Sequence, residues 1–175
     1  MTIRAAGAGD ADADADALAL VGGATFLESY AWMIPAADLL AHVAARHGAE
    51  VYAAWLADAG SRVFVATAPL GAVMGYAVLT APDLPADCVL DGDVELRRIY
   101  LLGIAQGQGS GAALMAAVLE GARDMGAARV TLGVHGGNAR AIGFYGRMGF
   151  APIGRRTFTV GGQVYDDLVM GRGFE

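Results

Sequence analysis

The feature that most constrains this chain is a glycine-rich turn between an expected strand and an expected helix. Residues 94–102 are rich in β-branched and aromatic residues, as strands are, and residues 110–125 carry apolar side chains at helical spacing. Gly107, Gly109 and Gly111 join the two segments. Because glycine lacks a Cβ, several backbone N–H groups can converge there, next to the positive end of the helix dipole. The stretch therefore predicts a binding site for phosphate.

Two common phosphate-binding motifs do not fit this turn. A P-loop requires Lys and then Ser or Thr after its last glycine, whereas Gly111 is followed by Ala112, Ala113 and Leu114. A dinucleotide-binding motif requires the spacing Gly-x-Gly-x-x-Gly and an acidic residue at the end of the next strand. The spacing here is Gly-x-Gly-x-Gly, and the next expected strand, residues 129–134, is followed by His135. Both classes of nucleotide-binding protein are therefore excluded.

The pattern Gln106-x-x-Gly109-x-Gly111 resembles the pyrophosphate-binding loop of the GNAT superfamily of N-acetyltransferases. A second pattern, Asn-x-x-Ala-x-x-Phe-Tyr-x-x-x-Gly-Phe over residues 138–150, is similar to the last helix of many GNAT proteins. Either motif alone is weak, but together they span residues 95–150 in the family's order of strand, loop, helix, strand and helix. The resemblance implies an α/β fold with a mixed central sheet of about six or seven strands, splayed between strands 4 and 5 and flanked by helices. We expect one domain over residues 1–175.

The resemblance also implies acetyl-CoA as co-substrate. In the family, the pantetheine arm pairs with the open edge of strand 4, which assigns it to the backbone of Ile99, Tyr100 and Leu101. The diphosphate-binding loop then comprises Gln106, Gly107, Gln108, Gly109, Ser110, Gly111 and Ala112. Asn138 is expected to cap the last helix and to contact the coenzyme. The loop carries no Arg or Lys, so phosphate binding would depend on backbone N–H groups and the helix dipole.

Two side chains match catalytic positions of the family. Tyr145 corresponds to the general acid that protonates the departing thiolate. Glu95 corresponds to a general base of some members, although an arginine-paired strand glutamate explains it equally well. An alkylamine has a pKa of about 10.4, so only about one molecule in a thousand is neutral at pH 7 and a base is needed. Other members carry a glutamate where this chain has Gly133, which favours Glu95, while His135 is read as a loop residue.

The sequence constrains the identity of the acceptor amine less than that of the co-substrate. Glu-Leu-Arg-Arg-Ile-Tyr at residues 95–100 and the segment from Phe150 to Met170 resemble bacterial spermidine/spermine N-acetyltransferases, which implies a polyamine. A small amine or amino-acid derivative is the second alternative and a protein amine the third. Phe26 and Tyr30 form either a wall of the acceptor site or ordinary core, and the loop 81–92 is placed to reach over the site. A non-catalytic acyl-CoA-binding regulator is the alternative from another class.

Composition excludes several partners and cofactors. The net charge of −6 over 175 residues disfavours nucleic acid and anionic membranes, and no apolar run is long enough to cross a bilayer. Three histidines and one cysteine lack metal-ligand spacing, so no metal is expected. The acidic, alanine-rich N-terminus is unlike a signal peptide, so we expect a cytoplasmic protein. We expect the protein to be a monomer or a homodimer. The aspartates of residues 10–16 are expected to be solvated at the start of a helix capped by Asp10 or Asp12.

The remaining elements follow from periodicity and turn residues. Further helices are expected over residues 35–47, 49–58 and 139–148, and strands over residues 2–5, 62–67, 72–79, 151–159 and 163–170.

Overall fold

The computed structural model describes residues 1–7, 9–107 and 109–174. Its elements are β1 (Thr2–Ala5), α1 (Ala11–Tyr30), α2 (Ala36–Arg46), α3 (Ala49–Ala57), β2 (Arg62–Thr67), β3 (Val73–Thr80), β4 (Asp93–Leu101), α4 (Ser110–Asp124), β5 (Arg129–His135), α5 (Ala139–Arg147), β6 (Ala151–Val160) and β7 (Gln163–Gly173). Two short 3₁₀ turns, Ala86–Cys88 and Gly103–Ala105, lie before and after β4. The expected order of elements is confirmed, and most ends differ from the prediction by one or two residues.

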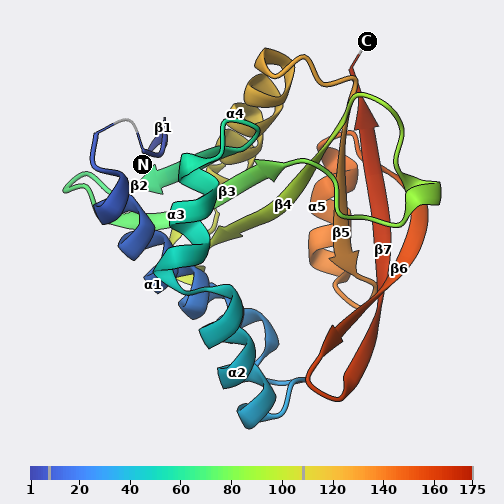
Figure 1. The fold of residues 1–175 in the computed structure, drawn as a ribbon, viewed down its shortest axis with the longest axis horizontal. Helices are drawn as coiled ribbons and strands as arrows, with labels where there is room; N and C mark the ends of the chain where they lie inside the picture. Colours follow the sequence, from blue (N-terminus) through green and yellow to red (C-terminus); the bar gives the residue numbers. More distant parts are fainter. Residues whose placement is uncertain (8, 108, 175) are drawn as a thin grey trace.

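One seven-stranded sheet runs through the molecule in the order β1-β2-β3-β4-β5-β7-β6. Neighbouring strands are antiparallel except β4 and β5, which run parallel. The parallel pairing covers only Asp93 to Glu95 against Arg129 to Thr131, after which the two strands diverge (Figure 1). The predicted split between strands 4 and 5 is therefore present in the fold.

Helices cover both faces of the sheet. α4 packs on one face, where Leu114, Met115 and Val118 join Ala77 and Leu79 of β3 in the main core. α1 and α3 pack on the other face, against the alternate residues of β3. Because β3 is buried on both faces, its sequence is apolar without a polar alternation.

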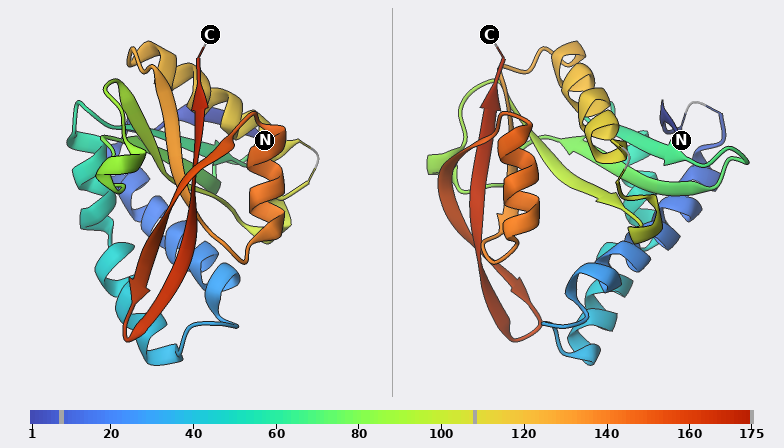
Figure 2. Two further views of the ribbon diagram at one scale, coloured as in Figure 1. Left: turned by 90° about the vertical axis from the view of Figure 1, so that its right-hand side faces the viewer. Right: turned by 180° about the vertical axis from the view of Figure 1, so that it is seen from behind.

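A third apolar cluster closes the open end of the split. Phe26 at the end of α1, Leu39 of α2 and Val160 of β6 are buried against one another. Figures 1 and 2 show the β6–β7 hairpin reaching across to α2, so that two segments distant in sequence lie side by side.

The first turn of α1 is partly as expected. Asp10 caps the helix by accepting the N–H of Ala13 at 3.0 Å. Asp14 is 5% exposed and pairs with Arg4 of β1 (2.9 Å), so the prediction that the whole aspartate run is solvated is wrong at this position. The alternation of Asp and Ala in this segment does not indicate the ion pair, because Arg4 and Asp14 come together only when β1 packs next to α1 in the folded protein.

In the part of the chain that the structure describes, no helix is long and apolar enough to span a membrane. Among the same residues, no three His, Cys, Asp or Glu side chains are grouped as metal ligands.

Candidate active site

A cavity of about 680 Å³ occupies the gap between the diverging β4 and β5. Its walls come from the second half of β4, the glycine loop, the start of α4, the end of β5 and α5. Of the residues predicted to bind the coenzyme, the structure brings together Ile99, Tyr100, Leu101, Gln106, Gly107, Gly109, Gly111, Ala112 and Asn138 on these walls, together with Tyr145. Ser110 is not among the lining residues, and Gln108 lies outside the described residues.

The glycine loop depends on two positive backbone angles. φ is +90° at Gly107 and +82° at Gly109, a region that residues with a Cβ rarely adopt. A Cβ at either position would meet no atom within 4 Å, so backbone conformation, not space, accounts for the glycines. Gly109 also precedes the first turn of α4, where backbone N–H groups have no partner within the helix, and Gly111 and Ala112 of this turn line the cavity. The local geometry is that of an anion-binding turn.

The edge of β4 that faces the gap keeps backbone groups available. The N–H of Leu102 donates to Met74 on β3 at 2.9 Å. Since successive strand residues direct their backbone groups to opposite sides, those of Leu101 and Ile99 point toward the gap and those of Tyr100 toward β3. The Leu101 carbonyl accepts Nε2 of Gln106 at 3.0 Å, whereas the described part of β5 pairs with β4 only as far as Glu95 and so leaves the N–H of Leu101 without a strand partner there.

Tyr145 lies on α5 and lines the 680 Å³ cavity. Asn138 caps this helix as predicted, accepting the N–H of Ala141 at 3.0 Å. Burial, and then the neighbouring Tyr100, raise the pKa of the Tyr145 hydroxyl above its usual value of 10. The hydroxyl is therefore protonated at neutral pH and can donate a proton or a hydrogen bond.

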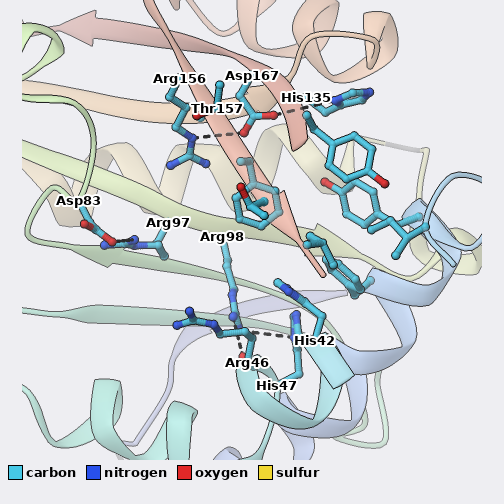
Figure 3. A pocket seen from close by; sticks show the side chains of 18 of the residues that line it. His42, Arg46, His47, Asp83, Arg97, Arg98, His135, Arg156, Thr157 and Asp167 are labelled. Atoms are coloured by element: carbon cyan, nitrogen blue, oxygen red, sulfur yellow. Dashed lines mark hydrogen bonds and ion pairs between the residues drawn. The ribbon is translucent and has the colours of Figure 1, made fainter. Parts of the chain in front are cut away.

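A second cavity, of about 740 Å³, lies between α1, α2 and the β6–β7 hairpin (Figure 3). We call it the acceptor-side cavity, because the residues that the sequence analysis considers for the acceptor site, Phe26 and Tyr30, lie on this side of the gap. Phe26 and Tyr30 line it, and Phe26 is also 3% exposed and stacked on His42 with ring centroids 4.4 Å apart. Phe26 is thus packed in the core and is also part of the cavity wall, so the two alternatives do not exclude each other. Leu84 and Pro85 of the loop 81–92 contribute to the wall as well, so this loop lies against the cavity.

The two cavities meet. The residues that line both are Tyr30, Arg97, Arg98, Tyr100, Gly133 and His135. A group on the coenzyme side and a group on the hairpin side can therefore approach each other where β4 and β5 separate.

A β-bulge in β4 directs two arginines to this junction. Val78 of β3 pairs with Arg98 and Leu79 pairs with Leu96, so Arg97 is an extra residue on β4. Leu96 and Ile99 consequently both face α4, and Arg97 and Arg98 both line the acceptor-side cavity. The alternation of the sequence alone would have placed these arginines on opposite faces.

Glu95 is enclosed. Its side chain is 1% exposed, lines neither cavity, and accepts the N–H of Asp83 at 2.7 Å. Its carboxylate also lies 3.4 Å from Nη2 of Arg97 and 3.9 Å from Nη1 of Arg156. These contacts anchor the loop 81–92 and hold two guanidinium groups in the cavity wall.

Three side chains to which the sequence analysis gave no catalytic or binding role form a row across β5, β7 and β6. Asp167 is paired in register with His135 on one side and Arg156 on the other. Its carboxylate lies 3.2 Å from Nε of Arg156 and 3.9 Å from Nδ1 of His135, a buried nitrogen with no hydrogen-bond partner among the described residues (Figure 3). The reading of His135 as a loop residue is wrong, because β5 extends through it. No local motif signals this row, because it depends on long-range strand register.

Asp167 has the environment of a proton acceptor. It is 5% exposed and lines the acceptor-side cavity. Burial raises the pKa of its carboxyl, and the charge of Arg156 only partly offsets this effect. Gly133 leaves room for the Arg156 guanidinium, with which a Cβ at this position would collide.

Comparison with known proteins identifies this arrangement. The model of the acetyltransferase (GNAT) family matches residues 27–150, which include the split, the glycine loop and α5. The chain belongs to the GNAT family. As a GNAT-family N-acetyltransferase it uses acetyl-CoA as co-substrate, as the glycine loop and the second motif predicted.

Relatives and solved structures agree with this assignment. The uncharacterized N-acetyltransferase Rv2669 of Mycobacterium tuberculosis (strain ATCC 25618 / H37Rv) is 38% identical over 155 residues, which are 89% of this chain and 94% of that protein. The PaiA N-acetyltransferase of Thermoplasma acidophilum, solved with coenzyme A, superposes with a TM-score of 0.76 over 99% of this chain and 100% of that one, at 17% identity. A ribosomal-protein-alanine N-acetyltransferase of Brucella melitensis gives a TM-score of 0.69 at 25% identity, over 99% and 100% of the two chains. At this level of identity, the likeness to PaiA shows the GNAT fold and gives no information about the substrate.

Proposed function

We propose that the protein transfers the acetyl group of acetyl-CoA directly to the primary amine of a small molecule, within a ternary complex. The observation that carries this proposal is the junction of the two cavities at Tyr30, Tyr100 and His135. Acetyl-CoA would occupy the 680 Å³ cavity, with its diphosphate on the glycine loop, and the amine would occupy the 740 Å³ cavity. A cavity of this size suits a small molecule better than a folded protein surface.

The coenzyme side supplies two groups for the transfer. The N–H of Leu101 would donate to the thioester oxygen as negative charge develops there, because it points into the gap and has no strand partner. Tyr145 would donate its proton to the sulfur as the carbon–sulfur bond breaks. Its raised pKa keeps that proton available at neutral pH.

The acceptor side supplies the base. The sequence predicts Glu95, but this carboxylate lines neither cavity and is held by Asp83 and two arginines. We therefore assign proton acceptance to Asp167, which lines the acceptor cavity, and assign Glu95 to holding the loop and the arginines in place. The attacking nitrogen gives its proton to Asp167 as the nitrogen–carbon bond forms.

Release of free thiol from acetyl-CoA in the presence of an amine panel tests the reaction. The panel contains spermidine, for the polyamine predicted from the sequence, and small amines, amino acids and an N-terminal peptide. Thiol release with at least one small amine, matched by its N-acetylated product in mass spectrometry, is expected. Tight binding of coenzyme without release for any member would instead favour an acyl-CoA-binding regulator.

Paired variants separate the two candidate bases. Asp167→Asn should lower kcat/KM about 100-fold and remove the acid limb of its pH profile. Glu95→Gln should mainly raise the KM for the amine, because the loop and arginines lose their anchor. An unchanged acid limb in Asp167→Asn, together with its loss in Glu95→Gln, would return the role of base to Glu95.

A further inference from the structure

The acceptor-side cavity has more positive than negative charge. Its charged walls carry Arg46, Arg97, Arg98 and Arg156 against Asp38, Asp83 and Asp167. Arg97 pairs with Asp83 (2.9 Å) and Arg156 with Asp167 (3.2 Å), and Glu95 lies behind both guanidinium groups. Over residues 1–7, 9–107 and 109–174, no carboxylate lies within ion-pair distance of Arg98 or Arg46. The guanidinium groups of Arg98 and Arg46 therefore lack an ion-pair partner among these residues.

Arg98 is held rigidly while its charge is left unpaired. It donates from Nη1 to the Tyr52 hydroxyl at 2.8 Å and from Nη2 to the Arg46 carbonyl at 2.6 Å. Its guanidinium also lies over the rings of Trp55, 4.8 Å from the centroid, and Tyr52, 5.3 Å from the centroid. These partners are neutral, so they fix the plane of the group without neutralising it. A pre-positioned guanidinium with N–H donors to spare is suited to bidentate binding of a carboxylate or phosphonate.

The surroundings of Arg98 are consistent with a positive field. His42 and His47 lie beside it on the same wall, and the charge of Arg98 contributes to lowering the pKa of both, after burial (Figure 3). Both rings are therefore neutral at pH 7, and among the described residues no carboxylate of α2 or α3 lies within ion-pair distance of Arg98. Asp38, in the first turn of α2, has no ion pair in the described chain and lies beside Gly161 of the hairpin.

We propose that the acceptor amine carries an anionic group, a carboxylate or phosphonate, that binds to Arg98 and Arg46. This inference rests on the proposed function and names the class of its second substrate. Because Arg98 lines both cavities, the anion lies near the reacting nitrogen, as in an α-amino acid or α-aminophosphonate. The apolar residues Phe26, Ile34 and Val160 then face the rest of the molecule. A polyamine, which has only positive charges, would bring like charge against this wall.

Matched pairs of acceptors test the proposal. Phenylalanine against phenethylamine, and lysine against cadaverine, differ only by the carboxylate, and 1-amino-2-phenylethylphosphonate distinguishes the two anions. In thiol-release assays, the acid of each pair should have a kcat/KM about 10- to 100-fold higher, the effect of one charge-assisted contact. In Arg98→Gln this preference should fall to about 2-fold or less, with little change in the KM for acetyl-CoA. Equal or better turnover of the decarboxylated amines or spermidine by the wild type would overturn the proposal.

Two further variants guard against a folding defect and against a role in coenzyme binding. Arg46→Gln removes an exposed side chain and should reduce the same preference in part, while Arg123→Gln on α4, which lines neither cavity, should not. A raised KM for acetyl-CoA in Arg98→Gln with an unaltered acceptor preference would assign Arg98 to the coenzyme and contradict the proposal.

Calorimetry separates failure of this inference from failure of the proposed function. Each acceptor is titrated into the protein saturated with coenzyme A, in which no transfer occurs. Amino acids should bind about 10- to 100-fold more tightly than their decarboxylated partners in the wild type and not in Arg98→Gln. If this holds without turnover of any amine, the anion site stands and the transferase reaction on small amines does not. If turnover occurs without the preference, the transferase reaction on small amines stands and the anion site does not.

Discussion

Protonation of His47 should limit the stability of this fold at acid pH. The side chain is 4% exposed, and Nδ1 lies 2.9 Å from the Tyr52 hydroxyl and 3.4 Å from Nη1 of Arg98. Arg98 can only donate hydrogen bonds, so the ring nitrogen that faces it must act as an acceptor. Burial, followed by the charges of Arg98 and His42, lowers the pKa of His47 from 6.5 to about 3.

The size of the effect follows from the two pKa values. In the unfolded chain His47 binds a proton below about pH 6.5, whereas in the folded chain it stays neutral until about pH 3. The contribution of His47 to the free energy of unfolding is therefore intact above pH 6.5 and declines by about 1.4 kcal/mol for each pH unit below that value. Between pH 7.5 and pH 4.5 the decline is at most about 3 kcal/mol.

Urea unfolding of the wild type and His47→Asn at pH 7.5 and 4.5 measures this contribution. Asparagine keeps an acceptor oxygen but does not titrate, and the carboxylates common to both proteins cancel in the difference. The variant should be less stable than the wild type at pH 7.5 and should regain about 3 kcal/mol relative to it at pH 4.5. His42→Asn, at a half-buried ring, should regain less. A wild-type-to-variant difference in free energy that does not change with pH would refute the assignment of a neutral, buried His47.

Three further changes test other parts of the structure. Tyr145→Phe should lower kcat about 100-fold with an unchanged Kd for coenzyme A, and equal turnover would remove the hydroxyl from the mechanism. Gly109→Ala, at φ +82°, should cost about 1 kcal/mol of stability and weaken coenzyme binding about 10-fold, whereas Gly162→Ala in the β6–β7 turn should do neither in titration calorimetry and urea unfolding. Asp93→Asn breaks the 2.6 Å pair with Arg129 at the closed end of the split and should lower the free energy of unfolding by about 3 kcal/mol; a loss below 1 kcal/mol would mean that the pair does not hold β4 to β5.

The parts of the fold that the sequence predicts are those set by local chemistry. The glycine turn lies between β4 and α4, where the sequence predicts it, and Asn138 caps its helix as predicted. The hairpins and most helix ends also lie close to their Gly and Pro signals. Neighbouring residues determine each of these features, so a single sequence is enough.

The chemistry of the acceptor side could not be predicted, because it depends on contacts between distant segments. A bulge at Arg97 changes which side chains share a face, and strand periodicity gives no sign of it. The row of His135, Asp167 and Arg156 exists only once β5, β7 and β6 are in register. Glu95 was predicted as a base from its position on β4, but its burial under the loop 81–92 is a tertiary feature.

A crystal structure of the protein with coenzyme A bound tests the central claim most directly. The account predicts the diphosphate on the N–H groups of the glycine loop, the pantetheine along the gap-facing edge of Ile99 and Leu101, and the thiol directed toward Tyr145 and the junction of the cavities. A coenzyme bound elsewhere, with the space between β4 and β5 filled by the protein's own side chains, would contradict it.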